Sequence, residues 1–467
     1  MKYRIESDSL GEVKVPAAAY YGVQTQRAIE NFDISRIKVS DYRELVKALG
    51  IVKLAAARAN YALGLLPKDI FQAMEGACQR IIDGEFDKEF PVDLIQGGAG
   101  TSTNMNANEV IANIALESMG KERGDYKTIS PNDHANLSQS TNDAYPTSLK
   151  VAFIYSNIEL IKHLEALIAS FRAKGKEFAS ILKMGRTEMQ DAVPMTVGQE
   201  FEAFAANLSE EVDRLNQNAK LFQEINMGAT AIGTGINSTP GYAELVTSKL
   251  SEIMGMTFIK ASNLIEATPD TGSYVIYSSA LKRLAVKLSK ISNDLRLLSS
   301  GPRCGFNEIN LPSLQPGSSI MPGKVNPVVP EMVSEVCYKV IGNDLTVTFA
   351  AEAGQLQLNA MEPVIAEAIL ESITYLCRAM DTLSQKCVDG ITANVDVCRN
   401  MVMNSIGLVT ALNPYIGYKN SAMIAKEALA TGKGVYELVL EHNVLDKAKL
   451  DEILDPENMI APHPFEK

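Results

Sequence analysis

The chain contains few of the residues and motifs from which common metal, redox and nucleotide sites are built. Only four histidines occur among its 467 residues, and none has HExxH or HxxxH spacing, so no histidine-built metal site is predicted. The six cysteines form no CxxC pair and several stand among apolar residues, which is typical of reduced packing residues in a cytoplasmic protein. The sequence has neither a GxGxxG or GK[ST] loop nor a GxSxG elbow, which argues against a nucleotide site and a serine hydrolase.

Long apolar runs and basic blocks are also missing. No segment approaches the roughly 18 consecutive apolar residues that a membrane helix needs, and residues 1–8 lack the apolar stretch of a secretory signal. The net charge is -12 and the pI is about 5.1, with no basic cluster to offset the acidic excess. These features predict a cytoplasmic protein with no nucleic-acid partner and no membrane partner.

What the sequence does contain is long helical periodicity. Prolines are absent between Pro146 and Pro194, between Pro194 and Pro240, and between Pro363 and Pro414, and each of these windows can hold a long uninterrupted helix. Apolar residues recur there every three or four positions. The most regular series, which we call the heptad seam, consists of Tyr277, Leu281, Leu284, Leu288, Ile291, Leu295 and Leu298.

This periodicity predicts an all-α fold in three domains. The expected boundaries are an N-terminal domain over residues 1–140, a central bundle of long antiparallel helices over 141–396, and a small C-terminal helical domain over 397–467. Helices with more than one apolar stripe usually pack against other subunits. An oligomer with a helical core shared between subunits is therefore expected.

The most informative segment is residues 317–327, GSSIMPGKVNP, which we call the signature loop. Glycine permits unusual backbone angles and proline interrupts helices, so this segment is predicted to be a loop between helices. It carries two serines, a lysine and an asparagine, which suit the binding of a small anion and the movement of a proton. The alternative is a surface connector, but Ile320, Met321 and Val325 are unusual in such connectors.

Three further polar segments precede predicted helices or separate them. They are residues 96–109 and 138–143, which are rich in serine, threonine and asparagine, and residues 185–191, which read GRTEMQD and lie in the break between two predicted long helices. Each alone is explained by helix capping. Together with the lysine of the signature loop they predict a receptor for a small dianion, because helix N-termini and hydroxyl groups bind carboxylates without a metal.

The signature loop matches GSSxMPxKxN, and on this motif the chain resembles the aspartase/fumarase superfamily over essentially its whole length. The stretches GGAGTSTNMNANEV, SQSTNDAYPT, NMGATAIGTG and EAGQLQLNAMEPV are more similar to aspartases than to class II fumarases. The resemblance implies deamination of L-aspartate to fumarate and ammonia. It leaves a class II fumarase, or another C–N lyase acting on a related dicarboxylate or amine, as alternatives. A catalytically silent scaffold protein is a further alternative, against which the intact Ser318, Lys324 and Asn326 argue.

The same resemblance implies an assembly and a set of roles. The expected enzyme is a homotetramer whose active sites are each shared by three subunits. It uses no organic cofactor and no resident metal site, although some aspartases are activated by a divalent cation such as magnesium. Ser318 corresponds to the general base. The substrate-binding positions are Thr101, Ser140, Thr141 and Ser319 for the β-carboxylate, Thr187, Lys324 and Asn326 for the α-carboxylate, and Asn142 and Glu188 for the amino group.

Glu188 departs from the family pattern. Class II fumarases have histidine at this position, and aspartases generally have histidine or glutamine. A carboxylate there attracts a substrate ammonium group but repels a substrate carboxylate. Glu188 therefore either recognises the substrate amino group or points to solvent.

Overall fold

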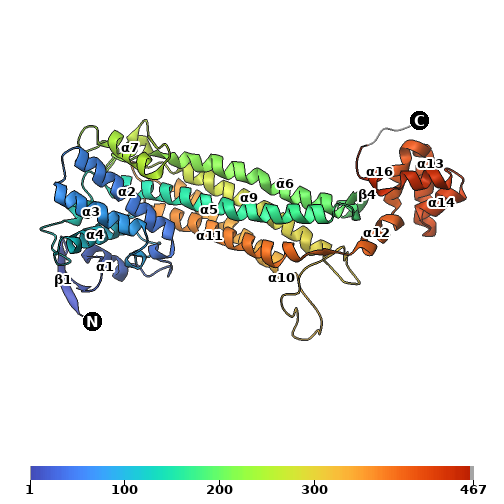
Figure 1. Ribbon diagram of the computed structural model, residues 1–467, viewed down its shortest axis with the longest axis horizontal. Coiled ribbons are helices and arrows are strands. Elements are labelled where there is room, and N and C mark those ends of the chain that lie inside the picture. The colour runs from blue at the N-terminus through green and yellow to red at the C-terminus, as the bar shows by residue number, and fades with distance from the viewer. Residues whose placement is uncertain (1, 463–467) are drawn as a thin grey trace. The chain divides into compact units, whose positions relative to one another are not determined.

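The computed structural model describes residues 2–462 and confirms a predominantly helical fold with long helices (Figure 1). Within this range strands occur only as four two-stranded pairings. The chain divides into two compact units. The first unit is Met1–Ile161, Asp213–Arg283 and Tyr338–Leu376, and the second is Lys162–Val212, Leu284–Cys337 and Cys377–Lys467. The predicted domain boundaries after residues 140 and 396 stay a prediction.

Five long helices supply a segment to each unit (Figure 1). They are α5 (Thr141–Glu177), α6 (Val197–Ala219), α9 (Gly272–Leu298), α10 (Val328–Glu352) and α11 (Glu362–Lys386). In the first unit, Tyr277 Oη of α9 donates to Asn157 Oδ1 of α5 at 3.0 Å, and both residues are buried. In the second unit, Lys287 Nζ of α9 lies 2.5 Å from the buried Glu211 Oε1 of α6. Polar pairs of this kind fix which helix faces meet, while apolar residues fill the space between them.

The heptad seam is buried within the single chain. All seven of its residues are at most 5% exposed, so the predicted periodicity is confirmed as a core-facing stripe of α9. Because the chain covers the seam with its own atoms, the seam does not itself offer a surface to another subunit. Any subunit interface must be built from other residues.

The N-terminal part of the first unit contains a hairpin and short helices that surround α4 (Thr101–Ser118). Strand β1 (Tyr3–Asp8) pairs antiparallel with β2 (Gly11–Pro16), and α1 (Val23–Asn31) packs on α4. Helix α2 (Arg43–Ala62) packs on both α3 (Lys68–Ile82) and α7 (Tyr242–Met254). The amino end of α4 carries one of the four polar segments, so these contacts fix part of the candidate site.

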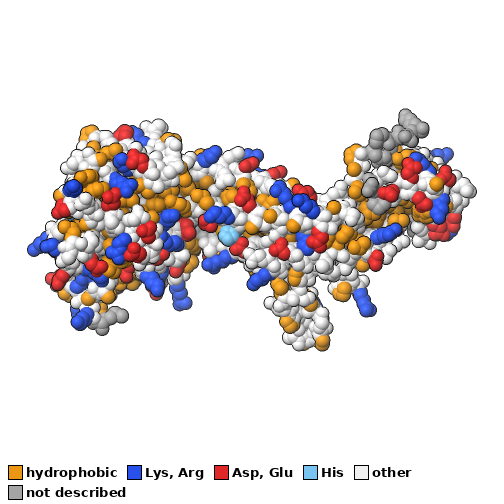
Figure 2. Space-filling view, in the orientation of Figure 1, with side chains coloured by type: hydrophobic (Ala, Val, Ile, Leu, Met, Phe, Trp, Pro, Cys, Tyr) orange, Lys and Arg blue, Asp and Glu red, His pale blue; other side chains and the backbone are white. Residues whose placement is uncertain are grey.

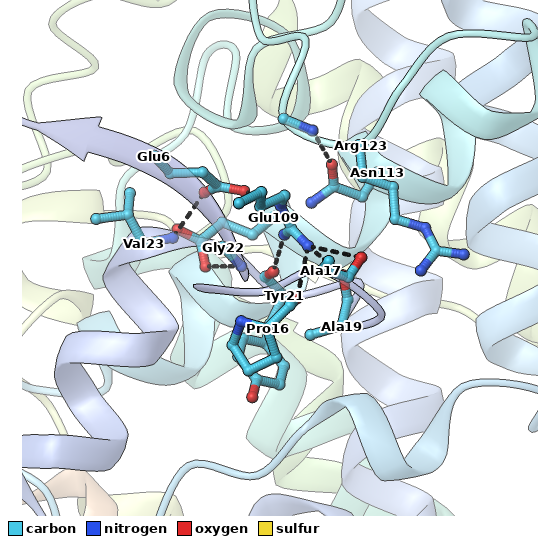
Figure 3. A network of polar contacts seen from close by, with 12 residues as sticks. Glu6, Pro16, Ala17, Ala19, Tyr21, Gly22, Val23, Glu109, Asn113 and Arg123 are labelled. Carbon is cyan, nitrogen blue, oxygen red and sulfur yellow. Dashed lines mark hydrogen bonds and ion pairs between the residues drawn. The ribbon is translucent and has the colours of Figure 1, made fainter. Parts of the chain in front are cut away.

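Two buried carboxylates anchor α1 and the hairpin to α4 (Figure 3). Glu109 Oε2 of α4 accepts from Gly22 N at 2.8 Å and from Thr25 Oγ1 at 2.7 Å, and Glu6 Oε2 accepts from Val23 N at 2.8 Å. Burial raises the pKa of Glu109 to about 7 despite these donors. A Cβ on Gly22 would lie 2.5 Å from Tyr126 Oη, so only glycine fits at this approach.

The C-terminal helices of the second unit have an apolar core of their own. They are α12 (Val395–Asn404), α13 (Val409–Thr431), α14 (Val435–Glu441), α15 (Lys447–Ile453) and α16 (Pro456–Met459). Leucine, isoleucine and valine side chains from α12 to α15 form this core together with Met184 of β3 (Leu182–Thr187). Strand β3 pairs antiparallel with β4 (Gln190–Thr196), and β3 also contacts α12. The β3–β4 hairpin is thus packed against the C-terminal helices.

The remaining α-helix and strands are short. They are α8 (Leu264–Ala267), the parallel pair β5 (Glu224–Ile225) and β6 (Ile259–Lys260), and the antiparallel pair β7 (Ile309–Asn310) and β8 (Thr392–Ala393). None of the helices in residues 2–462 combines the length and apolar character required to cross a membrane. On the face seen in Figure 2, positive and negative side chains are intermixed.

Candidate active site

The predicted site residues lie in three places of the chain. Thr101, Ser140, Thr141 and Asn142 stand at the amino ends of α4 and α5 in the first unit. Thr187 and Glu188 occupy the β3–β4 turn of the second unit. Ser318, Ser319, Lys324 and Asn326 belong to the signature loop between β7 and α10, also in the second unit.

A run of left-handed residues leads into α4. Gly98, Ala99 and Gly100 have φ values of 92°, 55° and 89°. Gly100 cannot be replaced without a clash, since a Cβ there would lie 2.3 Å from the ring of Tyr145. This bend places Thr101 at the first position of α4, exposed, with its Oγ1 donating to Gly98 O at 2.7 Å.

The amino end of α5 carries uncharged polar side chains supported by a buried carboxylate. Ser140 Oγ accepts from Asn142 N at 3.2 Å, and Asn142 Nδ2 donates to Ala231 O at 2.7 Å. Asp143 accepts from Ser140 N at 2.9 Å and from Thr230 N at 2.9 Å. Burial raises the pKa of Asp143 to about 6. Asp143 therefore ties the backbone at the start of α5 to the backbone at Thr230.

Lys53 and Asn104 also belong to this place and were not predicted from the sequence. Lys53 Nζ of α2 is buried and donates to Asn104 Oδ1 at 2.7 Å and to Gln139 Oε1 at 2.8 Å. Asn104 Nδ2 of α4 donates to Thr141 Oγ1 at 3.2 Å, which joins the two helix ends. Desolvation lowers the pKa of Lys53 to about 7. The available signal was a lone lysine inside the apolar run GIVKLAAA.

The turn that carries Thr187 and Glu188 is a tight hairpin rather than a plain helix break. Thr187 pairs with Gln190, and the two residues between them, Glu188 and Met189, have φ values of 52° and 66°. Two left-handed residues in a two-residue turn match the twist of the strands, although side chains other than glycine adopt this conformation with strain. Both side chains are exposed at the tip of the hairpin.

A buried charge cluster holds this hairpin. Arg186 Nη1 lies 2.6 Å from Glu308 Oε1, and Lys183 Nζ lies 3.0 Å from Glu308 Oε2 and also contacts Glu200. The Arg186 guanidinium stacks 4.2 Å from the ring centroid of Phe306. Removing one member of such a cluster leaves an uncompensated buried charge, so the position of the turn is strongly determined.

The signature loop presents its first serine to two backbone donors. Ser318 Oγ accepts from Ile320 N at 3.2 Å and from Met321 N at 3.1 Å. Donors aimed at this oxygen stabilise negative charge on it and so favour loss of its proton. The following Ser319 is exposed. Ser318 is thus placed as a group that can exchange a proton.

Two hydrogen bonds close the neck of the loop. Gly317 N donates to Lys324 O at 2.7 Å, and Asn326 Nδ2 donates to Gly317 O at 2.8 Å. A Cβ on Gly317 would lie 2.7 Å from Lys324 O, so glycine is required there. The Lys324 side chain is exposed and is one of the residues lining a cavity of about 1020 Å³, together with Asn326, Glu331 and Arg296.

The three places offer complementary chemistry. The first supplies hydroxyl and amide groups at two helix ends, and the signature loop supplies a cation and a serine with stabilising donors. Such groups bind carboxylates and remove a proton from carbon next to one of them. Among residues 2–462 no group of three or more His, Cys, Asp or Glu side chains is arranged to hold a metal ion.

Comparison with known proteins defines the class to which this fold and site belong. The family model described as "Lyase" matches residues 11–342, and the model described as "Fumarase C C-terminus" matches residues 408–461. The chain therefore belongs to this lyase family, which confirms the resemblance to the aspartase/fumarase superfamily. Among curated relatives, the aspartate ammonia-lyase of Pseudomonas aeruginosa is 61% identical over 98% of this chain and 97% of its own length. The aspartate ammonia-lyase of Helicobacter pylori is 56% identical over 99% of both chains.

Solved structures give the same fold. The structure of fumarate lyase:delta crystallin from Brucella melitensis bound to cobalt has a TM-score of 0.96 and 57% identity, covering 99% of this chain and 100% of that chain. The class II fumarase of Schistosoma mansoni has a TM-score of 0.92 but only 36% identity, at the same coverage. The fold is thus common to both groups of enzymes, whereas the sequence lies much nearer to the aspartate ammonia-lyases.

Proposed function

We propose that the chain is an aspartate ammonia-lyase, which converts L-aspartate reversibly to fumarate and ammonia. The observation that carries this conclusion is the 61% identity with an aspartate ammonia-lyase over 98% of the chain, against 36% with a class II fumarase. The four quoted segments, which resemble aspartases rather than fumarases, agree with it. Enzymes of this superfamily need no organic cofactor.

The reaction removes a proton from Cβ of aspartate, which is a very weak acid. The carbanion is stabilised as an aci-form of the β-carboxylate that carries two negative charges, so the enzyme must aim donors at that carboxylate. Thr101, Ser140, Thr141 and Ser319 fill this role. This assignment is supported by the positions of Thr101, Ser140 and Thr141 at helix amino ends, where the helix dipoles add positive potential.

Ser318 acts as the general base and takes the Cβ proton. A serine is a poor base unless its alkoxide is stabilised. The backbone N–H groups of Ile320 and Met321, directed at Ser318 Oγ at 3.2 and 3.1 Å, supply part of that stabilisation. The cation of Lys324 lies in the same loop, and with Thr187 and Asn326 it binds the α-carboxylate.

Asn142 and Glu188 lie beside the substrate amino group in this proposal. Glu188 at the hairpin tip then favours amine over hydroxyl substrates, because an ionised carboxylate attracts the ammonium group. Glu188→Gln keeps the shape and removes the charge. We expect it to raise KM for aspartate about fivefold and to leave inhibition by L-malate unchanged or strengthened.

Measuring both constants between about pH 6 and 9 checks this assignment, since the substrate amino group is a charged ammonium over most of that range. Glu202→Gln, at an exposed glutamate of α6, is the matched control and should behave as wild type. Equal aspartate affinity in wild type and Glu188→Gln at every pH would mean that Glu188 faces solvent and does not read the amine.

We also propose a homotetramer whose sites are each shared by three subunits. Its support is that the site residues stand in three places of one chain and that α10 exposes large apolar residues. Tyr338, Leu345 and Phe349 are 59%, 57% and 66% exposed and recur at helical spacing on one stripe. Apolar side chains on one helix stripe are typical of a surface covered by another subunit.

Charged substitutions on that stripe test the assembly. Leu345→Glu with Phe349→Glu is expected to dissociate the protein toward a species of 50.7 kDa in light scattering and to abolish most of its activity. Leu429→Glu, at the 77% exposed Leu429 of α13, should leave mass and activity unchanged. A fully active monomer would refute the shared-site proposal.

The cytoplasm is the proposed location. Its support is that Cys78, Cys337, Cys387 and Cys398 are buried and form no disulfide, as is usual in a reducing compartment. Activation by a divalent cation such as magnesium is a separate hypothesis, for which activity with added magnesium and with a chelator is the direct measurement.

The proposed reaction is tested by following fumarate absorbance with L-aspartate, L-malate and argininosuccinate as substrates. We expect fumarate from L-aspartate with release of one ammonia per fumarate, and far slower formation from the other two. Faster turnover of L-malate would make the protein a fumarase, and no turnover of any of the three would favour a silent scaffold protein.

A further inference from the structure

We propose that Lys53 and Asn104 are positioning residues that make the Thr141 hydroxyl a hydrogen-bond donor toward the substrate β-carboxylate. The inference rests on the role given to Thr141 under the proposed function. Lys53, Asn104 and Thr141 together form what we call the relay. All three lie in the first unit, on α2, α4 and α5, and all are at most 9% exposed.

Lys53 fixes the orientation of the Asn104 side chain. A protonated lysine amine can only donate hydrogen bonds. Lys53 Nζ lies 2.7 Å from Asn104, 2.8 Å from Gln139 and 3.2 Å from Asn136, and in each case the partner atom is a side-chain amide oxygen. The oxygen of Asn104 must therefore face Lys53, and its NH₂ group must face the other way.

That NH₂ group meets Thr141 and Asn136. Asn104 Nδ2 donates to Thr141 Oγ1 at 3.2 Å and to Asn136 Oδ1 at 3.1 Å. Asn136 cannot reverse this arrangement, because its oxygen also accepts from Lys53 and from Asn108 Nδ2 at 3.0 Å. Protonated Lys53 thus orients the side-chain amides of Asn104 and Asn136 directly, and Asn104 in turn orients Thr141.

The consequence concerns the single proton of the Thr141 hydroxyl. A hydroxyl that accepts a hydrogen bond from Asn104 keeps its own O–H for another acceptor. As the Cβ proton leaves, the β-carboxylate gains charge, and a hydroxyl that donates to it stabilises the transition state. A hydroxyl turned to present its lone pairs would repel that charge. The relay therefore makes the interaction between the Thr141 hydroxyl and the substrate β-carboxylate attractive instead of repulsive.

Asn104→Asp is the most direct test, because it keeps shape and replaces the donating NH₂ by an accepting oxygen. The Thr141 hydroxyl would then donate to the introduced carboxylate instead of the substrate, and kcat should fall about 10²–10³-fold, as when one oxyanion donor is lost. Asn104→Ala frees the hydroxyl to rotate and should cost only about tenfold. A purely structural role predicts the reverse order, because alanine leaves a cavity and aspartate does not.

Asn106→Asp is the matched control. Asn106 is equally buried on α4, but its side chain donates to Glu89 O at 2.9 Å and does not contact Thr141. The same change there should leave kcat within about threefold of wild type, since it touches no part of the relay. An equal loss in both variants would assign the effect to charge burial in α4 and overturn the proposal.

A double-mutant cycle with Thr141→Val separates this inference from the proposed function. If Asn104 acts through Thr141, either Asn104 variant should lower kcat only slightly further in the Thr141→Val background. If the losses in kcat from the two single variants instead multiply in the double variant, the relay is overturned. Should Asn104→Asp fail to fold, Asn104→Ala completes the same cycle. If Asn104→Asp keeps the wild-type kcat while Thr141→Val lowers it, the relay is overturned but the proposed role of Thr141 stands. A wild-type kcat for Thr141→Val overturns both the relay and the carboxylate site.

Discussion

Ser318→Ala is expected to lower kcat about 10²–10⁴-fold with L-aspartate, the range that a positioned general base contributes. The reason is local. Ser318 Oγ accepts two backbone N–H groups within its own loop, an arrangement that favours the deprotonated oxygen. Steady-state kinetics give kcat, and light scattering on the same samples checks that the assembly is unchanged.

Ser313→Ala is the matched control for this prediction. Ser313 is an exposed serine that precedes the signature loop and lines the same cavity as Lys324, but it carries no proposed role in proton transfer. It should retain near-wild-type kcat. A Ser318→Ala variant that keeps more than about a tenth of wild-type kcat would remove Ser318 from the role of base.

Lys324→Met is expected to raise KM for aspartate about 10–100-fold, which corresponds to the loss of one charge-assisted hydrogen bond of about 1.5–3 kcal/mol. The substitution should not disturb the loop itself. The hydrogen bond at the neck is made by the backbone oxygen of Lys324, and methionine keeps that atom in place. Because the amine acts as a point charge, Lys324→Arg should lose less affinity than Lys324→Met.

The measurement is KM and kcat for aspartate with both variants. Unchanged constants in Lys324→Met would show that this lysine is a solvated loop residue. An equal loss in both variants would mean that the shape of the lysine side chain, and not its charge, is what the site requires.

Helices could be predicted from the sequence because their signal is local. The heptad seam from Tyr277 to Leu298 repeats every three to four residues, and all of it is buried as expected. Periodicity says that a face is covered but does not say by which chain, so the seam could not locate a subunit surface. The exposed stripe of Tyr338, Leu345 and Phe349 became visible only once the covered faces were known.

The sequence proposes candidate site residues but not the contacts that connect them to the rest of the fold. Ser318 and Lys324 stand in one contiguous motif, so the sequence alone was enough to propose them. Lys53 and Asn104 are separated by 51 positions in the sequence. No local sequence pattern predicts a hydrogen bond between residues so far apart in the chain. The hairpin between α5 and α6 was missed for another reason: its strands are short, and a glycine and a proline interrupt them.

The neck of the signature loop has a mechanical consequence. Gly317 is hydrogen-bonded both to Lys324 O and to the Asn326 side chain, so residues 317–326 form a loop closed at its neck that contains the proposed base, Ser318, and the proposed carboxylate anchor, Lys324. A displacement that moves the neck as a whole requires a change in the flanking backbone, near Pro316 and Pro327. In such a displacement the proposed base and the proposed anchor move together, because both adjoin the neck.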